Sequence, residues 1–305
     1  MSAVMIEFPD KWVDASILED TLKAGPPPHE TPAPEIIFKF PIGCKIIIDT
    51  AVRLLSLINQ LEYCSRYIQL DFEEGEDGAM GYLNRMGFFD HLSKNVEVKP
   101  RRPLISGIEI YGGTNTKLVE IARIDHKCRD NDLPTRLTGA LMQTCSNRYD
   151  AKEMEDATWT IFCELIDNIF SHSETQLNGY AALQSYQRGQ RLRVAVSDSG
   201  LGIMETLRPA LKYDSPTLYR LSDIDLLVEI FRQGISRHGA DRGCGLKGSA
   251  AKAVKYNAEL DVRLPNLRIL LTPGQQGYQP NVAHCYENLP LIWGTHICFN
   301  FALDK

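Results

Sequence analysis

The sequence ELIDNIFSHSE, residues 164 to 174, carries regularly spaced polar residues within a segment that is otherwise rich in apolar residues. Apolar side chains in and before it recur at intervals of three and four residues, which predicts an amphipathic helix over about residues 153–172. Within that helix Glu164, Asn168 and His172 follow one another at four-residue spacing, so they form one polar stripe beside the apolar positions. The helix alone leaves two interpretations open. The stripe is either a face in contact with solvent or the polar lining of a ligand site.

Composition and charge limit the class of protein. The chain has 305 residues, of which 44% are hydrophobic and 24% charged, which is ordinary for a folded chain of one large or two smaller domains. A net charge of -6 argues against nucleic acid as a partner, because such binding depends on neutralising phosphates. Acids interrupt the amino terminus, no apolar run is long enough to span a bilayer, and the eight cysteines include no C-x-x-C pair. We therefore expect a cytoplasmic protein with no membrane partner.

The chain divides into three predicted segments. A proline-rich stretch, AGPPPHETPAPE (24–35), predicts an extended linker, so residues 1–34 are expected to be an amino-terminal arm that ends in this linker. Residues 35–115 alternate strand and helix patterns, which predicts a small α/β domain. This unit resembles the STAS-like domains of bacterial anti-sigma-factor antagonists, in which a strand with an acidic end leads through a short turn into a helix. Residues 116–305 are expected to form the second domain.

Local patterns predict the individual elements. Strands are predicted in EIIFKFP (35–41), YIQLDFE (67–73), PLISGIEIYGG (103–113) and KLVEIARI (117–124), and helices at 44–64, 78–92 and 133–146. The segments 178–187 and 190–200 predict two strands joined by a tight turn at Arg188 and Gly189.

A second motif, DSGLGI (198–203), follows the last of these strands. Asp198 is followed by glycines two and four residues later, Gly200 and Gly202. Since glycine has no Cβ, the backbone can approach a flat ligand closely, and the carboxylate can accept a hydrogen bond from an exocyclic amine. A tight turn without any ligand would show the same pattern, so this motif alone does not establish a site.

A third motif, DRGCGLKGSAAKAVKY (241–256), places Gly243, Gly245 and Gly248 before and within the start of a predicted helix. The amino terminus of a helix offers unpaired N–H groups and the positive end of its dipole to an anion, and Lys247 adds a positive charge. The spacing fits neither the P-loop nor the Rossmann fingerprint. The motif predicts a phosphate-binding loop of another kind.

Together and in this order, the three motifs and a late strand, GTHICFNF (294–301), resemble the nucleotide boxes of the GHKL superfamily. Gyrase B, Hsp90, histidine kinases and MutL share this ATP-binding fold. The resemblance runs from about Lys117 to Lys305. It implies an α/β fold, more finely an α+β two-layer sandwich of the Bergerat type, in which helices cover one face of a mixed sheet. The small α/β domain would precede it.

The resemblance also implies the roles of single residues. Asn168 would coordinate Mg2+, Glu164 would act as the general base toward water, and Asp198 would accept from the adenine amino group. Residues expected to hold the adenine are Gly200, Gly202, Ile203 and Thr295. Residues expected to cover the phosphates are Gly243, Gly245, Leu246 and Lys247. The segment 205–242 would be the ATP lid.

ATP and Mg2+ are thus the expected ligands, and three functions remain open. The chain could be a nucleotide-dependent switch with weak ATP hydrolysis that signals to a partner protein. It could be a serine protein kinase of the anti-sigma-factor type that acts on a STAS-like partner. It could also be a binding module in which ATP is structural. Many relatives dimerise on ATP binding, which adds a homodimer to the expected assemblies.

Overall fold

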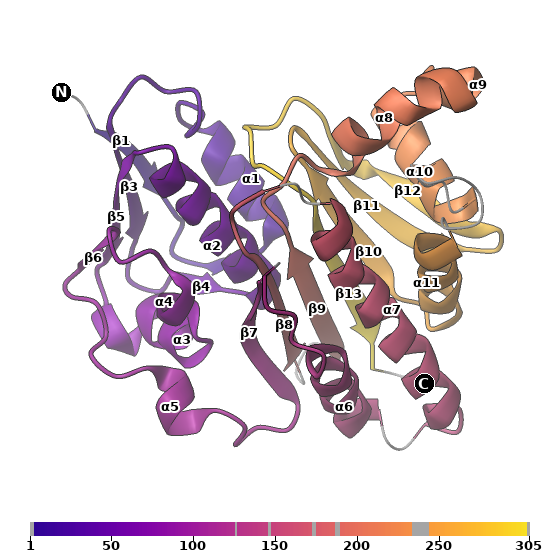
Figure 1. Ribbon diagram of the computed structural model, residues 1–305. Helices are drawn as coiled ribbons and strands as arrows, with labels where there is room; N and C mark the ends of the chain where they lie inside the picture. The colour runs from indigo at the N-terminus through magenta and orange to yellow at the C-terminus, as the bar shows by residue number, and fades with distance from the viewer. Residues whose placement is uncertain are drawn as a thin grey trace.

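The computed structural model describes residues 3–125, 127–145, 148–172, 175–186, 190–233 and 244–303, with the backbone alone described for residues 171–172 and 244–246. Its helices surround a four-stranded and a seven-stranded sheet, and a further pair of short strands lies beside them (Figure 1). The predicted α/β class is confirmed.

The amino-terminal unit is built on a sheet in which every neighbouring pair of strands is parallel. In spatial order the strands are β1 (Val4–Glu7), β3 (Glu35–Phe40), β5 (Tyr67–Phe72) and β6 (Glu97–Lys99). Its helices are α1 (Ala15–Lys23), α2 (Ile48–Tyr63), η1 (Gly75–Asp77), α3 (Ala79–Arg85), α4 (Phe88–His91) and α5 (Gly107–Tyr111). The short pair consists of β2 (Trp12–Val13) and β4 (Lys45–Ile46).

The segment expected to be an arm belongs to this unit. Strand β1 pairs with β3 along its whole length, and Leu18 and Leu22 of α1 are buried in the core of the unit. The alternation of Val4, Ile6 and Phe8, all buried, is the strand pattern that the expectation of an arm overlooked.

Two other expectations about this unit were wrong. The predicted strand at 103–113 contains helix α5, because the Ser106 hydroxyl caps the Ile108 N–H at 3.1 Å and so starts a helix. The predicted helix at 78–92 is two helices, α3 and α4. They are separated at Gly87, whose φ of 77° a residue with a Cβ rarely adopts.

The carboxyl-terminal unit is built on the seven-stranded sheet, whose neighbouring pairs are all antiparallel among the residues described. In spatial order the strands are β12 (Gly277–Tyr286), β11 (Leu267–Gly274), β10 (Glu259–Leu264), β13 (His296–Ala302), β9 (Arg191–Ser197), β8 (Gly179–Tyr186) and β7 (Leu118–Ile124). The expectation of a mixed sheet is therefore wrong. The predicted hairpin of β8 and β9 is confirmed, although its turn at Arg188 and Gly189 lies outside the described residues.

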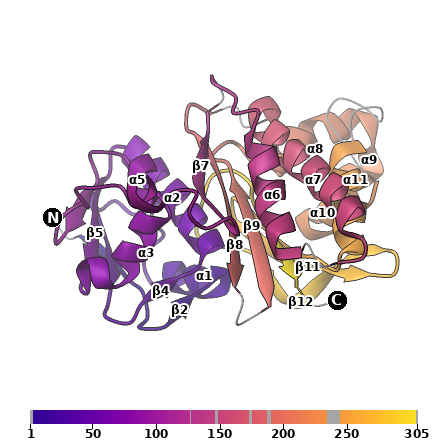
Figure 2. The same cartoon turned by 90° about the horizontal axis from the view of Figure 1, so that it is seen from below.

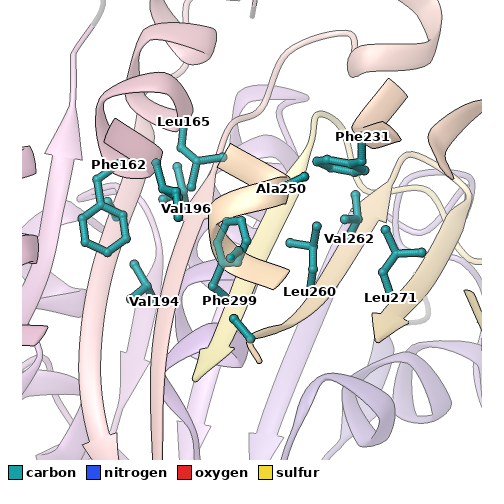
Figure 3. Packing of buried hydrophobic residues seen from close by; sticks show 14 of the residues in the cluster. Phe162, Leu165, Val194, Val196, Phe231, Ala250, Leu260, Val262, Leu271 and Phe299 are labelled. Atoms are coloured by element: carbon teal, nitrogen blue, oxygen red, sulfur yellow. The ribbon is translucent and has the colours of Figure 1, made fainter. Parts of the chain in front are cut away.

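Both faces of this sheet are covered. One face carries α6 (Leu133–Cys145), α7 (Ala151–His172), α10 (Asp223–Gln233) and α11 (Cys244–Lys255), with α8 (Ile203–Asp214) and α9 (Pro216–Tyr219) at its edge (Figure 1). Figure 3 shows Val194 and Val196 of β9 beneath Phe162 and Leu165 of α7. Ala195, which points the opposite way, packs with the core of the amino-terminal unit. Helix α2 therefore lies between the two sheets (Figure 2).

The contact between α2 and the seven-stranded sheet also contains polar pairs. Asp49 accepts from Arg193 at 2.8 Å, Arg53 pairs with Asp261 at 3.2 Å, and the hydroxyls of Ser56 and Ser197 lie 2.8 Å apart. Asp49, Arg53 and Ser56 are buried. Buried polar groups are costly unless they are paired, so these contacts fix how the two units sit on one another.

Candidate functional site

The first part of the candidate site is a pair of turns where β9 ends and β13 begins. Asp198 follows the last residue of β9, and Thr295 precedes the first residue of β13. The Asp198 carboxylate accepts from the Gly200 N–H at 2.7 Å and from the Thr295 N–H at 3.1 Å. The Thr295 hydroxyl accepts in turn from the N–H of Ile203, the first residue of α8, at 3.1 Å. One aspartate therefore organises both turns.

Two glycines allow the turns to approach each other. Gly294 has a φ of +94°, and a Cβ placed on it would lie 2.2 Å from the carbonyl oxygen of Asp198. Gly202 has a φ of +84°, and a Cβ there would lie 3.2 Å from the Gly294 carbonyl oxygen in the other turn and 3.0 Å from Pro265 Cδ. Any larger residue would push the turns apart or strain the backbone. The predicted residues Asp198, Gly200, Gly202, Ile203 and Thr295 are thus brought together by the fold.

Burial raises the pKa of the Asp198 carboxyl to about 6, although the hydrogen bonds from Gly200 and Thr295 act in the opposite direction. Burial disfavours the charged form of the carboxyl group because the charge loses its hydration, and here the hydrogen bonds offset only part of that cost. Raised pKa values of this kind are frequent at functional sites, where a ligand completes the set of partners.

This pKa predicts how stability depends on pH. The folded value of about 6 lies above the ordinary value of 3.8, so the folded protein binds this proton more tightly than the unfolded chain does. The resulting stabilisation is complete below about pH 4 and is lost as the pH rises through about 6. Relative to Asp198→Asn, the free energy of unfolding of the wild type should therefore fall by about 2 kcal/mol between pH 4 and pH 7. Urea denaturation of both proteins across this window measures the difference. A difference that does not change with pH would contradict the raised pKa.

Helix α7 carries the second part of the site. Its apolar side chains are buried against the sheet, whereas Glu164 and Asn168 are half-buried on another face. Neither of these two side chains has a hydrogen-bond partner among the residues described. Asp167 between them forms an ion pair with Arg129. The polar stripe predicted from the sequence is therefore neither buried by packing nor fully solvated, and the His172 side chain lies outside the described residues.

The electrostatic surroundings of Glu164 raise the pKa of its carboxyl group. Burial raises its pKa, the negative charge of Asp167 raises it further, and Lys252 of α11 lowers it. A carboxyl group whose pKa lies above its ordinary value is a stronger base than a solvated one. Lys252 acts across the contact between α7 and α11, so these two helices lie beside each other over the sheet (Figure 1).

Glycine at position 179 brings helix α7 to the two turns. A Cβ on Gly179 would lie 2.9 Å from the Ile169 side chain and 3.0 Å from the Ser197 carbonyl oxygen. Ile169 follows Asn168, and Ser197 precedes Asp198. The carboxyl-terminal half of α7 therefore packs over the end of β9 at which the turns lie.

Helix α11 carries the third group of predicted residues. It begins at Cys244, so Gly245, Leu246 and Lys247 lie in its first turn and not in a loop before it. The Lys247 side chain is exposed, the side chain of Leu246 is outside the description, and Gly243 lies outside the described residues altogether. The phosphate contacts expected of these four residues stay predictions.

Part of the segment expected to be a lid is packed in the core. Within residues 205–242, helix α10 buries four apolar side chains in the core: Leu226, Leu227, Ile230 and Phe231. Figure 3 shows Phe231 beside Val262 and Leu271 of the sheet. Helix α10 is thus part of the packed domain, and residues 234–243 lie outside the described residues.

The sequence did not point to the residues behind the turns. Gln60 of α2 hydrogen-bonds Ser199 and Trp293, each of which neighbours a site residue. The sequence did contain a signal, because the spacing of Asp49, Arg53 and Gln60 places these three polar residues on one face of helix α2.

In comparisons with known proteins, no family model matches the chain and no curated protein matches it. Across the described ranges, no cluster of three or more His, Cys, Asp or Glu side chains could hold a metal ion. No helix in the described part combines the length and apolar character needed to cross a membrane.

Proposed function

We propose that the chain binds Mg-ATP in the manner of GHKL proteins and acts as a nucleotide-dependent switch, with weak ATP hydrolysis and a partner protein. Residues 116–305 would form the Bergerat-type ATP-binding domain. The observation that carries the proposal is the pair of turns organised by Asp198, whose buried carboxylate has a raised pKa and lies at the end of two central strands.

The chemistry of the available groups fits this ligand. The Asp198 carboxylate accepts from the N–H groups of Gly200 and Thr295 and interacts with the Thr295 side chain. A carboxylate can accept about four hydrogen bonds, so one lone pair would remain for the amino group of adenine. Asn168 offers a hard oxygen with no partner among the described residues, which suits Mg2+ that retains several waters. Glu164 offers a base of raised pKa one helical turn away. ATP would supply the phosphoanhydride on which hydrolysis or transfer acts.

Incubation of the purified chain with γ-labelled ATP and Mg2+ tests the proposal. Slow release of labelled phosphate supports a switch with weak hydrolysis. Label on the serine of an added STAS-like protein would instead establish the kinase. Binding by calorimetry without release or transfer would mean that ATP is structural. Absence of binding would refute the proposed function.

Exchange of Asp198 for asparagine is expected to weaken ATP binding about ten- to a hundredfold. The amide would present a donor to the adenine amine, and a buried mismatch of this kind costs on the order of 1–3 kcal/mol. Calorimetry of wild type and variant measures the loss, and circular dichroism confirms that the variant is folded. Asp156→Asn is the control, because Asp156 is exposed near the other end of α7. Equal affinities in a folded Asp198→Asn protein would remove Asp198 from the site.

A further inference from the structure

We propose that Gln60 of the amino-terminal unit holds both turns of the candidate site in their binding arrangement, so that nucleotide binding is coupled to the proline-rich segment 24–35. Gln60 would be a positioning residue that acts through Ser199 and Trp293. The inference rests on the nucleotide binding proposed above and adds its regulation by the amino-terminal unit.

The amide of Gln60 is fully buried and all of its hydrogen-bonding groups are used. Its Nε2 donates to the Ser199 hydroxyl at 3.0 Å and to the Trp293 carbonyl at 3.0 Å. Its Oε1 accepts from the Trp293 N–H at 2.9 Å. Ser199 is followed by Gly200, and Trp293 by Gly294. One side chain from the other unit is therefore bonded to both turns, next to the residues that shape the site.

The proline-rich segment reaches the same point through His29. The Nε2 atom of His29 lies 3.3 Å from Gln60 Oε1, and its ring stacks on Trp293 with the ring centroids 5.0 Å apart. Burial lowers the pKa of His29, so the neutral ring can donate to the amide oxygen. Trp293 also meets the edge of Tyr63, the last residue of α2. The predicted linker is thus packed against the back of the candidate site.

These contacts imply coupling in both directions. A shift of the turns when a nucleotide binds would stretch or release the bonds of Gln60, and through them the packing of His29. Linkage is reciprocal. If nucleotide binding shifts an equilibrium of the amino-terminal unit that moves Gln60, then a shift of that equilibrium changes nucleotide affinity by the same factor. Ser56 supports this path one turn earlier on α2, since its hydroxyl bonds that of Ser197, which in turn bonds His296 of β13.

The first test compares two buried amides on the same helix. Gln60→Leu removes every bond to the turns, whereas Asn59→Leu removes bonds to Tyr180, His91 and Ser93 and none to the turns. We expect about tenfold weaker ATP binding by Gln60→Leu, because unpaired backbone groups of Trp293 disfavour the binding arrangement. Asn59→Leu should bind within about twofold of wild type, as residues without shared partners affect a site little. Calorimetry with MgATP measures both, with circular dichroism as the check of folding.

The second test follows hydrogen exchange in the full-length wild type. The amides of Glu30 and Thr31 donate to the Pro27 carbonyl within the proline-rich segment. Saturating MgATP is expected to slow their exchange at least threefold and to leave strand β6, on the far edge of the same unit, unchanged. A purely structural role of Gln60 would not transmit ATP binding to this segment.

The outcomes separate the two proposals. Wild type that binds no ATP refutes the proposed function. Wild type that binds ATP while a folded Gln60→Leu binds it equally well overturns the role of Gln60 alone. If Gln60→Leu does not fold, exchange in wild type decides: unchanged exchange at Glu30 and Thr31 with ATP bound overturns the coupling, and slowed exchange supports it.

Discussion

Replacement of Glu19 by alanine is expected to lower the free energy of unfolding by about 3–5 kcal/mol, because it leaves the buried Arg263 without its carboxylate and removes one of the two carboxylates that face the buried Arg53. Glu19 of α1 accepts from Arg263 Nε at 2.9 Å and from Arg263 Nη2 at 3.2 Å, and its Oε1 lies 3.5 Å from Arg53 Nη1. Glu19 is 1% exposed, Arg53 2% and Arg263 0%. Such a pair adds little net stability over apolar side chains, yet removal of one partner leaves a buried charge uncompensated.

Urea denaturation of wild type and Glu19→Ala measures this loss. Glu7→Ala is the matched control, since Glu7 pairs with Lys39 at 3.1 Å on the surface and should contribute less than about 1 kcal/mol. A loss below about 1 kcal/mol for Glu19→Ala would show that the amino-terminal unit is not held to the seven-stranded sheet by this cluster.

The elements predicted well are those whose pattern is complete within one segment. Helices α6 and α7 begin and end within two residues of their predicted bounds, and strands β8 and β9 pair as a hairpin. Helical spacing and strand alternation are local properties, so a single sequence carries them.

The parts that failed depend on partners distant in sequence. Residues 1–34 were expected to be an arm because prolines near their end suggest a linker, whereas β1 is a sheet strand only through its pairing with β3. The buried polar residues of α2 also have no explanation within their own segment. Arg53 is compatible with burial because Asp261, more than two hundred positions later, faces it. Whether such a polar residue is buried or exposed cannot be predicted from the sequence pattern until its partners are known.

Only part of the candidate site could be predicted, because some of its residues depend on partners distant in sequence. The turn that contains Asp198 is encoded locally by an acid and two glycines, and the structure places the predicted residues around it. Gln60 lies more than one hundred residues away, and its contact with Ser199 and Trp293 depends on the packing of the two units. The sequence could indicate the residues of the turns but not the residues that support them from behind.

Removal of the Glu164 carboxylate is the strongest expected effect on chemistry. If Glu164 is the general base of a weak ATPase, Glu164→Ala should lower phosphate release about 10²–10⁴-fold and leave MgATP affinity nearly unchanged, because a base acts mainly in the transition state. The raised pKa and the absence of a hydrogen-bond partner among the described residues are the properties this role requires. Asp156→Ala on the same helix, where the side chain is exposed, should release phosphate at the wild-type rate.

The variant Asn168→Ala tests the proposed metal ligand separately from the proposed base. Asn168 lies one turn further along α7, and its oxygen is the proposed protein ligand of Mg2+. Its loss should make nucleotide affinity less dependent on Mg2+, since the phosphates lose the side chain that anchors the metal.

A solvated stripe predicts instead that both variants bind and turn over ATP like wild type. The measurements are ATP affinity with and without Mg2+, and phosphate release, for wild type and the two variants. Unchanged turnover in Glu164→Ala would exclude it as the base and favour a switch without hydrolysis. Unchanged metal dependence in Asn168→Ala would contradict the GHKL assignment of α7 itself.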